Sequence, residues 1–474
     1  MLEGLEISEV RLSYVLSSND TFRIDSNFFQ KEFIHAELVI RGKKALTLAA
    51  TGAVLRSFGA YSLNNQVEYL DEGVPFIRGV NMKKGRISFS NLICISEEAN
   101  SLLWKSEVKP GMVLLSMSGT IGDVALASKN WAYPINSNQD IAKIDTAGKV
   151  NPYFLYSFLL SKFGQNYLLR EARGSVQQHV FLSQIEKFEI PTFSSVFDVE
   201  IQKTIENSDE LLSNSEAEYI QGENFLLDAV GLQDFFPLPS TVNIKSFNNS
   251  FGRTGRLDAE HYQSKYEELY KALAKNNHVF KLGDRLSFNQ RGTQPDYAEE
   301  GLPVVNSKHV QRGHVNLSDT RFAIMPDNKT ATVIKQGDVL MNGTGVGTIG
   351  RAAPYLHAAD ALPDNHVTVL RTAAFSPICL ALYLNSIAGQ YQVDQHFKGS
   401  SGQIELYPTD IANFWCPELD IATQKKIDKL AQQSFTLKAQ SERLLEAAKR
   451  AVEIAIEQDE AAGMAYLARE GALT

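Results

Sequence analysis

Three glycines of the chain have the spacing of a phosphate-binding loop. The segment Gly345-Val-Gly-Thr-Ile-Gly350 matches the pattern G-x-G-x-x-G and follows an apolar segment typical of a strand. Such a loop binds a dinucleotide or adenosylmethionine when it opens a helix within a strand–helix–strand unit. Here Pro354 interrupts the helix that should follow, and no such unit surrounds the loop. We therefore predict a loop that lets the backbone approach a ligand closely. A stand-alone nucleotide-cofactor enzyme that uses Gly345–Gly350 is the alternative function.

The sequence contains none of the common catalytic motifs. There is no G-x-S-x-G elbow, no H-E-x-x-H, no Walker loop and no Asn/Asp-Pro-Pro-aromatic motif. The nine histidines are scattered, and a lone histidine is more often structural than a metal ligand. We predict a protein without catalytic residues, without a cofactor of its own and without a metal site.

Two polar, glycine-rich loops occupy matching places in the chain. Arg173-Gly-Ser-Val-Gln-Gln178 and Lys398-Gly-Ser-Ser-Gly-Gln403 each combine a base, a glycine, a hydroxyl and a terminal amide. Arginine and lysine suit phosphates or guanine edges, glutamine suits adenine, and serine and glycine permit close backbone approach. Solvated turns are the alternative interpretation. From these loops we predict DNA contacts by Arg173, Ser175, Gln177, Gln178, Lys398, Ser400, Ser401 and Gln403.

Further polar residues recur at two other matching places. One place holds a run of basic and amide residues after an apolar segment, and the other is the loop that reads Ser118-Gly-Thr-Ile-Gly122 in the first half and Gly345–Gly350 in the second. Their residue types suit the same DNA groups. To the predicted DNA-binding residues we add Arg78, Asn81, Lys83, Ser116, Ser118, Asn306, Lys308, Asn342 and Thr344.

The loops recur because the whole chain contains the same pattern twice. Five segments of the first half have similar counterparts in the second half, in the same order. The pairs are Arg23–Phe29 with Arg256–Tyr262, Gly73–Ile77 with Gly301–Val305, Lys109–Leu115 with Lys335–Met341, Phe163–Gln165 with Ala388–Gln390, and Ile201–Ile205 with Thr423–Ile427. Chance similarity would not stay collinear, so the pattern indicates a divergent duplication. The loop side chains differ between the copies, as expected if two related modules read different DNA sequences.

Each copy has a mixed region followed by a long helix. Short β-branched runs at 111–117 and 337–342 predict buried strands, and helices are expected near 151–170 and 377–396, where Pro152 and Pro377 suit a first turn. Beyond them, apolar residues recur every seven positions, which is typical of a coiled coil. These seam positions are Ile205, Leu212, Tyr219, Leu226, Leu430, Leu437, Leu444 and Ala451.

These patterns predict an α+β fold with two duplicated domains of mixed α/β structure. Two long helices separate the domains, and we expect them to pair as an antiparallel coiled coil with pseudo-twofold symmetry. The predicted parts are a first mixed α/β domain (1–193), a first long helix (194–232), a second mixed α/β domain (233–417), a second long helix (418–460) and a C-terminal tail (461–474).

Composition sets limits on the environment of the protein. The 474 residues are 44% hydrophobic and 21% charged, which is ordinary globular usage. Three distant cysteines exclude a disulfide framework and suit a reducing compartment. The net charge is −9, but the segment 198–228 holds nine acids and one lysine. The rest of the chain is therefore nearly neutral, and the net charge does not exclude DNA binding by that part. No apolar run approaches the ~20 residues of a membrane span, and we predict a cytoplasmic protein.

The motifs together resemble the specificity subunit of type I restriction–modification systems. The resemblance extends over roughly residues 10–456 and rests on Gly73–Gly79, Lys109–Leu115, Gly119–Gly122, Arg173–Ser175 and their second-half counterparts. It implies two target-recognition domains that each read one half of a split site in double-stranded DNA, and two long helices that act as a spacer. It also implies docking of two methyltransferase subunits, which carry the adenosylmethionine, and recruitment of restriction subunits that translocate DNA. The specificity subunit itself is implied to be non-catalytic.

Overall fold

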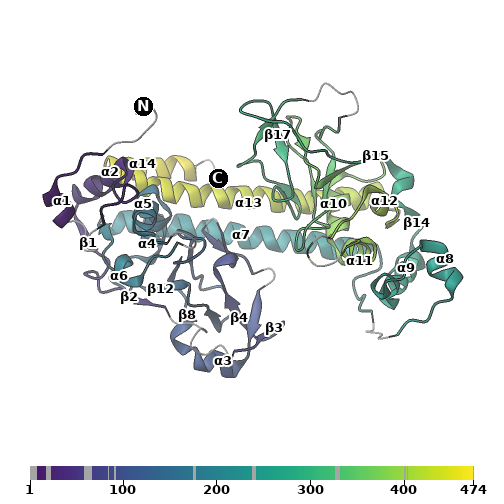
Figure 1. Cartoon of the computed structure of the whole chain (residues 1–474), viewed down its shortest axis with the longest axis horizontal. Helices are drawn as coiled ribbons and strands as arrows, with labels where there is room; N and C mark the ends of the chain where they lie inside the picture. The colour runs from purple at the N-terminus through teal and green to yellow at the C-terminus, as the bar shows by residue number, and fades with distance from the viewer. Residues whose placement is uncertain are drawn as a thin grey trace. The chain divides into compact units, whose positions relative to one another are not determined.

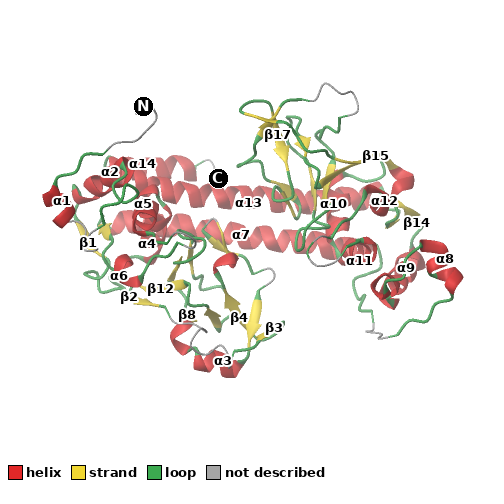
Figure 2. Cartoon of the chain, in the orientation of Figure 1, coloured by secondary structure: helices red, strands yellow, loops and turns green. Residues whose placement is uncertain are grey.

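The computed structural model describes residues 8–17, 23–57, 67–83, 85–89, 92–174, 178–237, 242–325, 331–399, 402 and 404–472. The chain folds into two compact units (Figure 1). Unit 1 comprises Met1–Leu211 with Gln440–Thr474, and unit 2 comprises Leu212–Ala439. Helices and strands are mixed in both units (Figure 2), which confirms the predicted α+β class.

Unit 1 contains two sheets, a strand pair and a hairpin. One sheet has the order β10-β9-β12-β2 and the other the order β3-β7-β4-β11-β8, in which β4 and β11 are parallel. The pair β1–β13 and the hairpin β5–β6 complete the β-structure. The strands are β1 (Ala45–Thr47), β2 (Val54–Arg56), β3 (Tyr69–Leu70), β4 (Val74–Ile77), β5 (Met82–Lys83), β6 (Arg86–Ile87), β7 (Ile93–Ile95), β8 (Glu107–Val108), β9 (Val113–Ser116), β10 (Val124–Leu126), β11 (Ile135–Ser137), β12 (Ile141–Asp145) and β13 (Glu189–Pro191).

Unit 2 repeats this plan. Its sheets have the orders β22-β21-β24-β15 and β16-β20-β17-β23, with β17 and β23 parallel, and it has its own pair β14–β25 and hairpin β18–β19. The strands are β14 (Val279–Lys281), β15 (Leu286–Arg291), β16 (Tyr297–Ala298), β17 (Leu302–Val305), β18 (Val310–Gln311), β19 (His314–Val315), β20 (Phe322–Ala323), β21 (Val339–Asn342), β22 (Ala352–Pro354), β23 (Leu362–Pro363), β24 (Val367–Thr372) and β25 (Trp415–Pro417).

The shorter helices also occur in corresponding places. In unit 1 these are α1 (Leu12–Ser17), α2 (Lys31–Arg41), α3 (Glu97–Leu102), α4 (Pro152–Leu160), α5 (Lys162–Glu171) and α6 (Leu182–Ile185). In unit 2 they are α8 (Phe251–Thr254), α9 (Ser264–Asn276), α10 (Pro377–Asn385), α11 (Ile387–His396) and α12 (Pro408–Ile411). None of the helices within the described part of the chain is long and apolar enough to cross a membrane.

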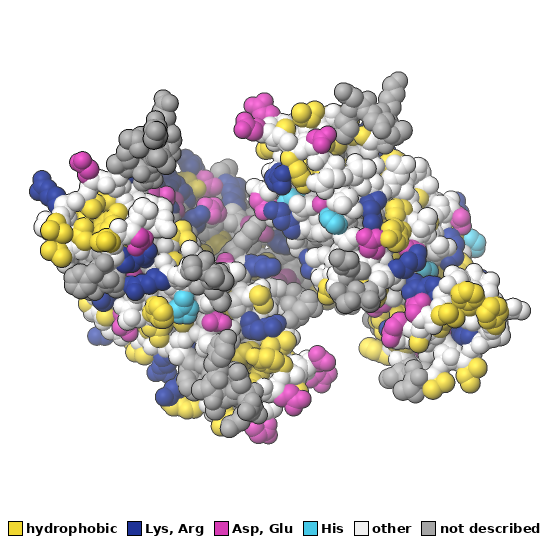
Figure 3. All heavy atoms as spheres, in the orientation of Figure 1, with side chains coloured by type: hydrophobic (Ala, Val, Ile, Leu, Met, Phe, Trp, Pro, Cys, Tyr) yellow, Lys and Arg dark blue, Asp and Glu magenta, His cyan; other side chains and the backbone are white. Residues whose placement is uncertain are grey.

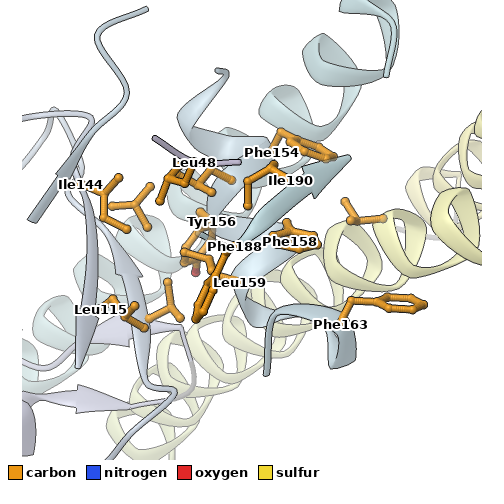
Figure 4. Packing of buried hydrophobic residues seen from close by; sticks show 14 of the residues in the cluster. Leu48, Leu115, Ile144, Phe154, Tyr156, Phe158, Leu159, Phe163, Phe188 and Ile190 are labelled. Carbon is orange, nitrogen blue, oxygen red and sulfur yellow. The ribbon is translucent and has the colours of Figure 1, made fainter. Parts of the chain in front are cut away.

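A buried helix organises the core of each unit. In unit 1, Asn151 caps α4 by accepting hydrogen bonds from the backbone of the first turn, and Pro152 starts the helix. Its apolar side chains, among them Phe154 and Phe158, pack against β9, β12 and β13 (Figure 4). In unit 2, Ser376 and Pro377 start the equivalent α10 in the same way. The strands with the predicted turn glycines, β9 and β21, are buried throughout.

Two long helices, α7 (Ser195–Ala229) and α13 (Ile421–Glu457), pass through both units and fit a coiled coil. At ~1.5 Å per residue each extends over about 50–55 Å. Within unit 1, Ser208 of α7 meets Ser441 of α13, and within unit 2, Ser215 meets Ser434, so the helices run antiparallel in each unit. The predicted seam residues lie along this contact: Ile205, Leu226, Leu444 and Ala451 are buried, and Leu212, Tyr219, Leu430 and Leu437 are half-buried.

Small residues alternate with the apolar seam residues. Ser208, Ser215 and Gly222 take the intervening heptad positions on α7, and Ser434 and Ser441 do so on α13. A Cβ on Gly222 would lie 3.5 Å from the Leu430 Cβ, so the helices approach closely there and α7 continues through the glycine without a break. The tail forms a helix, α14 (Glu460–Gly471), which folds back onto unit 1 and buries Leu467.

Candidate nucleic-acid interface

Three loops of unit 1 meet at the ends of β4 and β9. The backbones of Arg173 and His179 pair with each other through two hydrogen bonds of 3.0 and 2.7 Å. His179 also forms a bridge with Ser118, which follows β9. The loop after β4 is close as well, because a Cβ on Gly79 would lie 3.5 Å from the Ser116 hydroxyl. We call this group, Arg78, Ser118, Arg173 and His179, the first loop cluster.

The two arginines of the first loop cluster carry unused hydrogen-bond donors. Among the described residues, none accepts a hydrogen bond from Nε of Arg78 or from Nε and Nη2 of Arg173, although these atoms are buried. A buried donor without a partner costs free energy, and the planar guanidinium matches phosphate oxygens or the edge of guanine. A cavity of about 640 Å³ adjoins Arg173 and is also lined by Arg23 and Gln178. The donors therefore suit an external anionic or guanine ligand.

Unit 2 builds the same cluster from different residues. Glu405 forms bridges with both Lys398 and Thr344, as His179 does in unit 1 with Arg173 and Ser118. The Thr344 hydroxyl lies 2.8 Å from Nδ1 of His366. We call this group, Asn306, Thr344, Lys398 and Glu405, the second loop cluster. The two clusters have one backbone design and different side chains.

Three of the predicted DNA-binding residues are buried and hold the loops in shape. The Asn81 carboxamide oxygen accepts a hydrogen bond of 2.9 Å from the Arg78 backbone. The Ser116 hydroxyl donates to the Ser118 carbonyl, and the Asn342 amide donates to the Ser307 carbonyl. Because Ser116 and Asn342 have no exposed surface, we expect these three residues to position the loops rather than to contact DNA.

The predicted basic residues differ in their partners. Lys83 is exposed in the hairpin β5–β6. Lys308 forms an ion pair of 2.7 Å with Asp319, and Lys398 forms one of 2.8 Å with Asp410. In unit 2 burial lowers the pKa of His309, the counterpart of Asn81, and its Nδ1 accepts a hydrogen bond from the Asn306 backbone. Ser175, Gln177, Ser400, Ser401 and Gln403 lie outside the described residues.

Sequence reasoning missed several residues at these clusters. Phe181 and Tyr407 follow His179 and Glu405 at corresponding positions and keep exposed rings. Arg291 donates a 2.8 Å hydrogen bond to the Leu406 carbonyl, its Nε has no partner among the described residues, and it lies 5.0 Å from the Tyr407 ring. The recurrence of an aromatic residue at these positions was a usable signal. Arg291 had none, because it comes from a distant strand.

The glycine loop at 345–350 is part of the second cluster and does not open a helix. It makes tight turns and leads into β22, just as its counterpart in unit 1 leads into β10. The alternative function, a nucleotide-cofactor enzyme using this loop, therefore has no support. The three cysteines are buried and unpaired, and the described residues include no cluster of three or more His, Cys, Asp or Glu placed to hold a metal.

Residues 58–221 match the family described as "Type I restriction modification DNA specificity domain". The structure is similar to the S subunit of a type I restriction–modification system from M. genitalium, with 13% identity, a TM-score of 0.39, and 87% of this chain and 95% of that chain covered. It is also similar to the HsdS subunit from Thermoanaerobacter tengcongensis, with 15% identity, a TM-score of 0.29, and 88% and 97% covered. No curated protein matches the chain. The family match thus falls on the part of the chain that contains the first loop cluster.

Proposed function

We propose that each unit reads one half of a bipartite, asymmetric DNA target through its loop cluster. The observation that carries this proposal is the repetition of one loop framework with different side chains. At matching positions the first loop cluster has Arg78, Ser118, Arg173 and His179, and the second has Asn306, Thr344, Lys398 and Glu405. The two clusters share a backbone framework and differ in their side chains. This is expected of two modules that present different hydrogen-bond donors and acceptors to different bases.

The chemistry of the clusters supports contacts with both backbone and bases. The unpartnered guanidinium atoms of Arg78 and Arg173 suit phosphate or guanine. Amide and hydroxyl groups at Asn306 and Thr344 suit base edges or sugar–phosphate oxygens. The exposed rings of Phe181 and Tyr407 offer apolar contact beside them. We propose this role for the exposed predicted residues, and a positioning role for Asn81, Ser116 and Asn342.

We propose further that the long helices set the gap between the half-sites and dock two methyltransferase subunits. Restriction subunits that translocate DNA would join the same complex. In this arrangement the chain supplies recognition alone, and its partners supply adenosylmethionine, ATP and the catalytic residues. The heptad seam of α7 and α13 supports a spacer role because paired helices are stiffer than a single one.

The test is an exchange of recognition modules. Residues 242–417 of this chain would be replaced by the second domain of another member of the family, and methylated adenines would be mapped in DNA treated with the hybrid and its methyltransferase partners. We expect one half of the motif to change and the other half to stay. If both halves change, or neither does, the modular assignment is wrong. Replacing residues 23–191 instead is the matched reciprocal experiment.

A further inference from the structure

A cavity of about 540 Å³ lies in unit 2 between α8, α9 and the strand pair β14–β25. Four basic residues line it: Lys245, Arg253, Lys271 and Lys281. Among the described residues that line the cavity, Glu267 is the one acid, and it already forms an ion pair with Lys245. The space-filling view shows Lys and Arg side chains over the α11–β14 part of this face (Figure 3). The cavity therefore holds an excess of positive charge.

The pKa values of Lys281 and His396 are both lowered at this cavity. Burial and then the positive charge of Arg253 lower the pKa of Lys281 to about 8, and these effects outweigh the attraction of Asp284. Burial, followed by His261 and Lys281, lowers the pKa of His396 to about 4. Burial is the main reason why the charged forms of both groups are disfavoured, and the positive charges beside them act in the same direction. An anion in the cavity would relieve this repulsion.

In unit 1 the corresponding place has balanced charges. There Arg170 forms a buried 2.7 Å ion pair with Glu37, and Arg41 bonds both Glu37 and Glu189. Two arginines thus face two glutamates. Glu189 pairs with Thr47 across β1–β13, exactly where Trp415 pairs with Lys281 across β14–β25.

The charged residues at this place therefore differ between the two units. In unit 2, Gln395 stands in place of Arg170, and Tyr270 in place of Glu37. Unit 2 thus lacks both members of the Arg170–Glu37 ion pair, while Lys281 and Arg253 line its cavity. This difference suits a site that takes its negative charge from a ligand.

We infer that this cavity binds a phosphate ester of nucleotide size. Arg253, Lys271 and Lys281 would hold the phosphate, since lysine and arginine are the usual phosphate ligands of proteins. Its volume exceeds the needs of a phosphate ion alone and falls within the range of small-molecule sites. The aromatic side chains of Tyr266, Tyr270 and Trp415 form the apolar wall for the remainder of the ligand. The phosphate comes either from a free nucleotide or from a DNA strand.

The experiment measures binding of ATP, inorganic pyrophosphate and a DNA duplex to the full chain by calorimetry. We expect Arg253→Gln and Lys271→Gln each to weaken binding of the phosphate compound about tenfold, the effect of one lost charged hydrogen bond. Lys275→Gln is the matched control, because Lys275 is exposed on the same helix, α9, and does not line the cavity. Circular dichroism melting of each variant shows whether the fold is intact.

The outcomes separate the two sources. Loss of ATP and pyrophosphate binding in the cavity variants, with duplex binding unchanged, identifies a free nucleotide. Loss of duplex binding alone identifies a phosphate of the DNA strand. If ATP, pyrophosphate and duplex all bind the cavity variants as they bind the Lys275 control, the inference is wrong. Because none of the loop-cluster residues is altered, this failure would leave the proposed reading of the half-sites untouched.

Discussion

Ser208 and Ser441 each donate a hydrogen bond to the backbone carbonyl of the other, at 2.7 and 2.6 Å, across the contact of α7 and α13 in unit 1. Both side chains are buried. Only a small side chain leaves room for a hydroxyl to reach the opposite backbone, so this pair fixes both the spacing and the register of the two helices.

We expect Ser441→Leu to lower the free energy of unfolding by about 1–3 kcal/mol or more, because the larger side chain overpacks the contact. Ser441→Ala should cost about 1–2 kcal/mol, since the Ser208 carbonyl and the Arg86 guanidinium each lose a partner. Urea unfolding measures both. Ser213→Leu, on the exposed side of α7, should change stability by less than about 0.5 kcal/mol. Equal effects at 213 and 441 would contradict the close packing.

Arg173→Ala should weaken DNA binding without lowering the melting temperature, because two of the buried guanidinium atoms lack a partner among the described residues. Titrations of target duplex at several salt concentrations distinguish the contact. A lost phosphate contact weakens binding to all sequences and flattens the salt dependence, whereas a lost guanine contact costs about 1–3 kcal/mol at one base pair. Arg173→Lys should rescue only the former. Lys149→Ala, an exposed control away from the cluster, should bind normally; identical binding by Arg173→Ala would remove this residue from the interface.

Lys143 in β12 is buried, and its ammonium donates to the Ser137 hydroxyl at 3.0 Å. Burial lowers its pKa from 10.5 to about 7. The unfolded chain therefore binds more protons than the folded one between these values, so this group makes stability rise with pH across that window and imposes its full penalty below about pH 7. We expect Lys143→Met to stabilise unit 1 at neutral pH by a few kcal/mol and to flatten the pH dependence of urea unfolding. Lys149→Met is the exposed control, and parallel pH profiles for the two variants would sink this prediction.

Gly463 lets α14 lie against the long helices within unit 1. A Cβ there would be 2.8 Å from the Ala451 carbonyl oxygen and 3.1 Å from the Phe197 ring. Gly463→Leu should therefore release α14, expose Leu467, and lower the unfolding free energy by about 1–3 kcal/mol. Limited proteolysis should then cleave the tail faster. The control is Ala461→Leu, which lies on the exposed side of the same helix; equal protection of both variants would show that the tail does not depend on this contact.

If the long helices set the gap between the half-sites, one heptad added to each should lengthen it. Insertions near Ser213 and Leu437 keep the seam, since seven residues return nearly to the same helix face. Each helix grows by about 10 Å at ~1.5 Å per residue, which is about three base pairs at ~3.4 Å. Methylation by the assembled complex should then peak on sites whose gap is longer by about three pairs. A peak at the original gap would mean that the helices do not set the spacing.

The sequence predicted the elements whose signal is periodic or repeated. The α+β class, the helices near 151–170 and 377–396, and the long helices follow from apolar spacing and from the duplication. Ile205 and Leu444 could be predicted as seam residues because they are apolar. Ser208 and Ser441 were missed because a small polar residue in a heptad looks like a solvated position until its partner is known.

The sequence could not predict the directions in which these side chains point. Asn81, Ser116 and Asn342 have the residue types of DNA ligands, yet they point into the loops, because strands distant in the sequence surround them. The unpaired donors of Arg173 and the contact of Arg291 with the second cluster likewise depend on loop geometry. The recurrence of polar residues in both halves predicted the loops, but the packing of the surrounding strands determines which loop side chains face outward.

Arg86 gives unit 1 a mechanical linkage. From β6 its guanidinium bonds Ser208 and Asp209 on α7 and Ser441 on α13. A rotation of either helix about its own axis moves these acceptors and must pull the hairpin β5–β6, which carries Lys83, along with it. The position of the hairpin is therefore coupled to the rotation of both long helices within unit 1 through one guanidinium group.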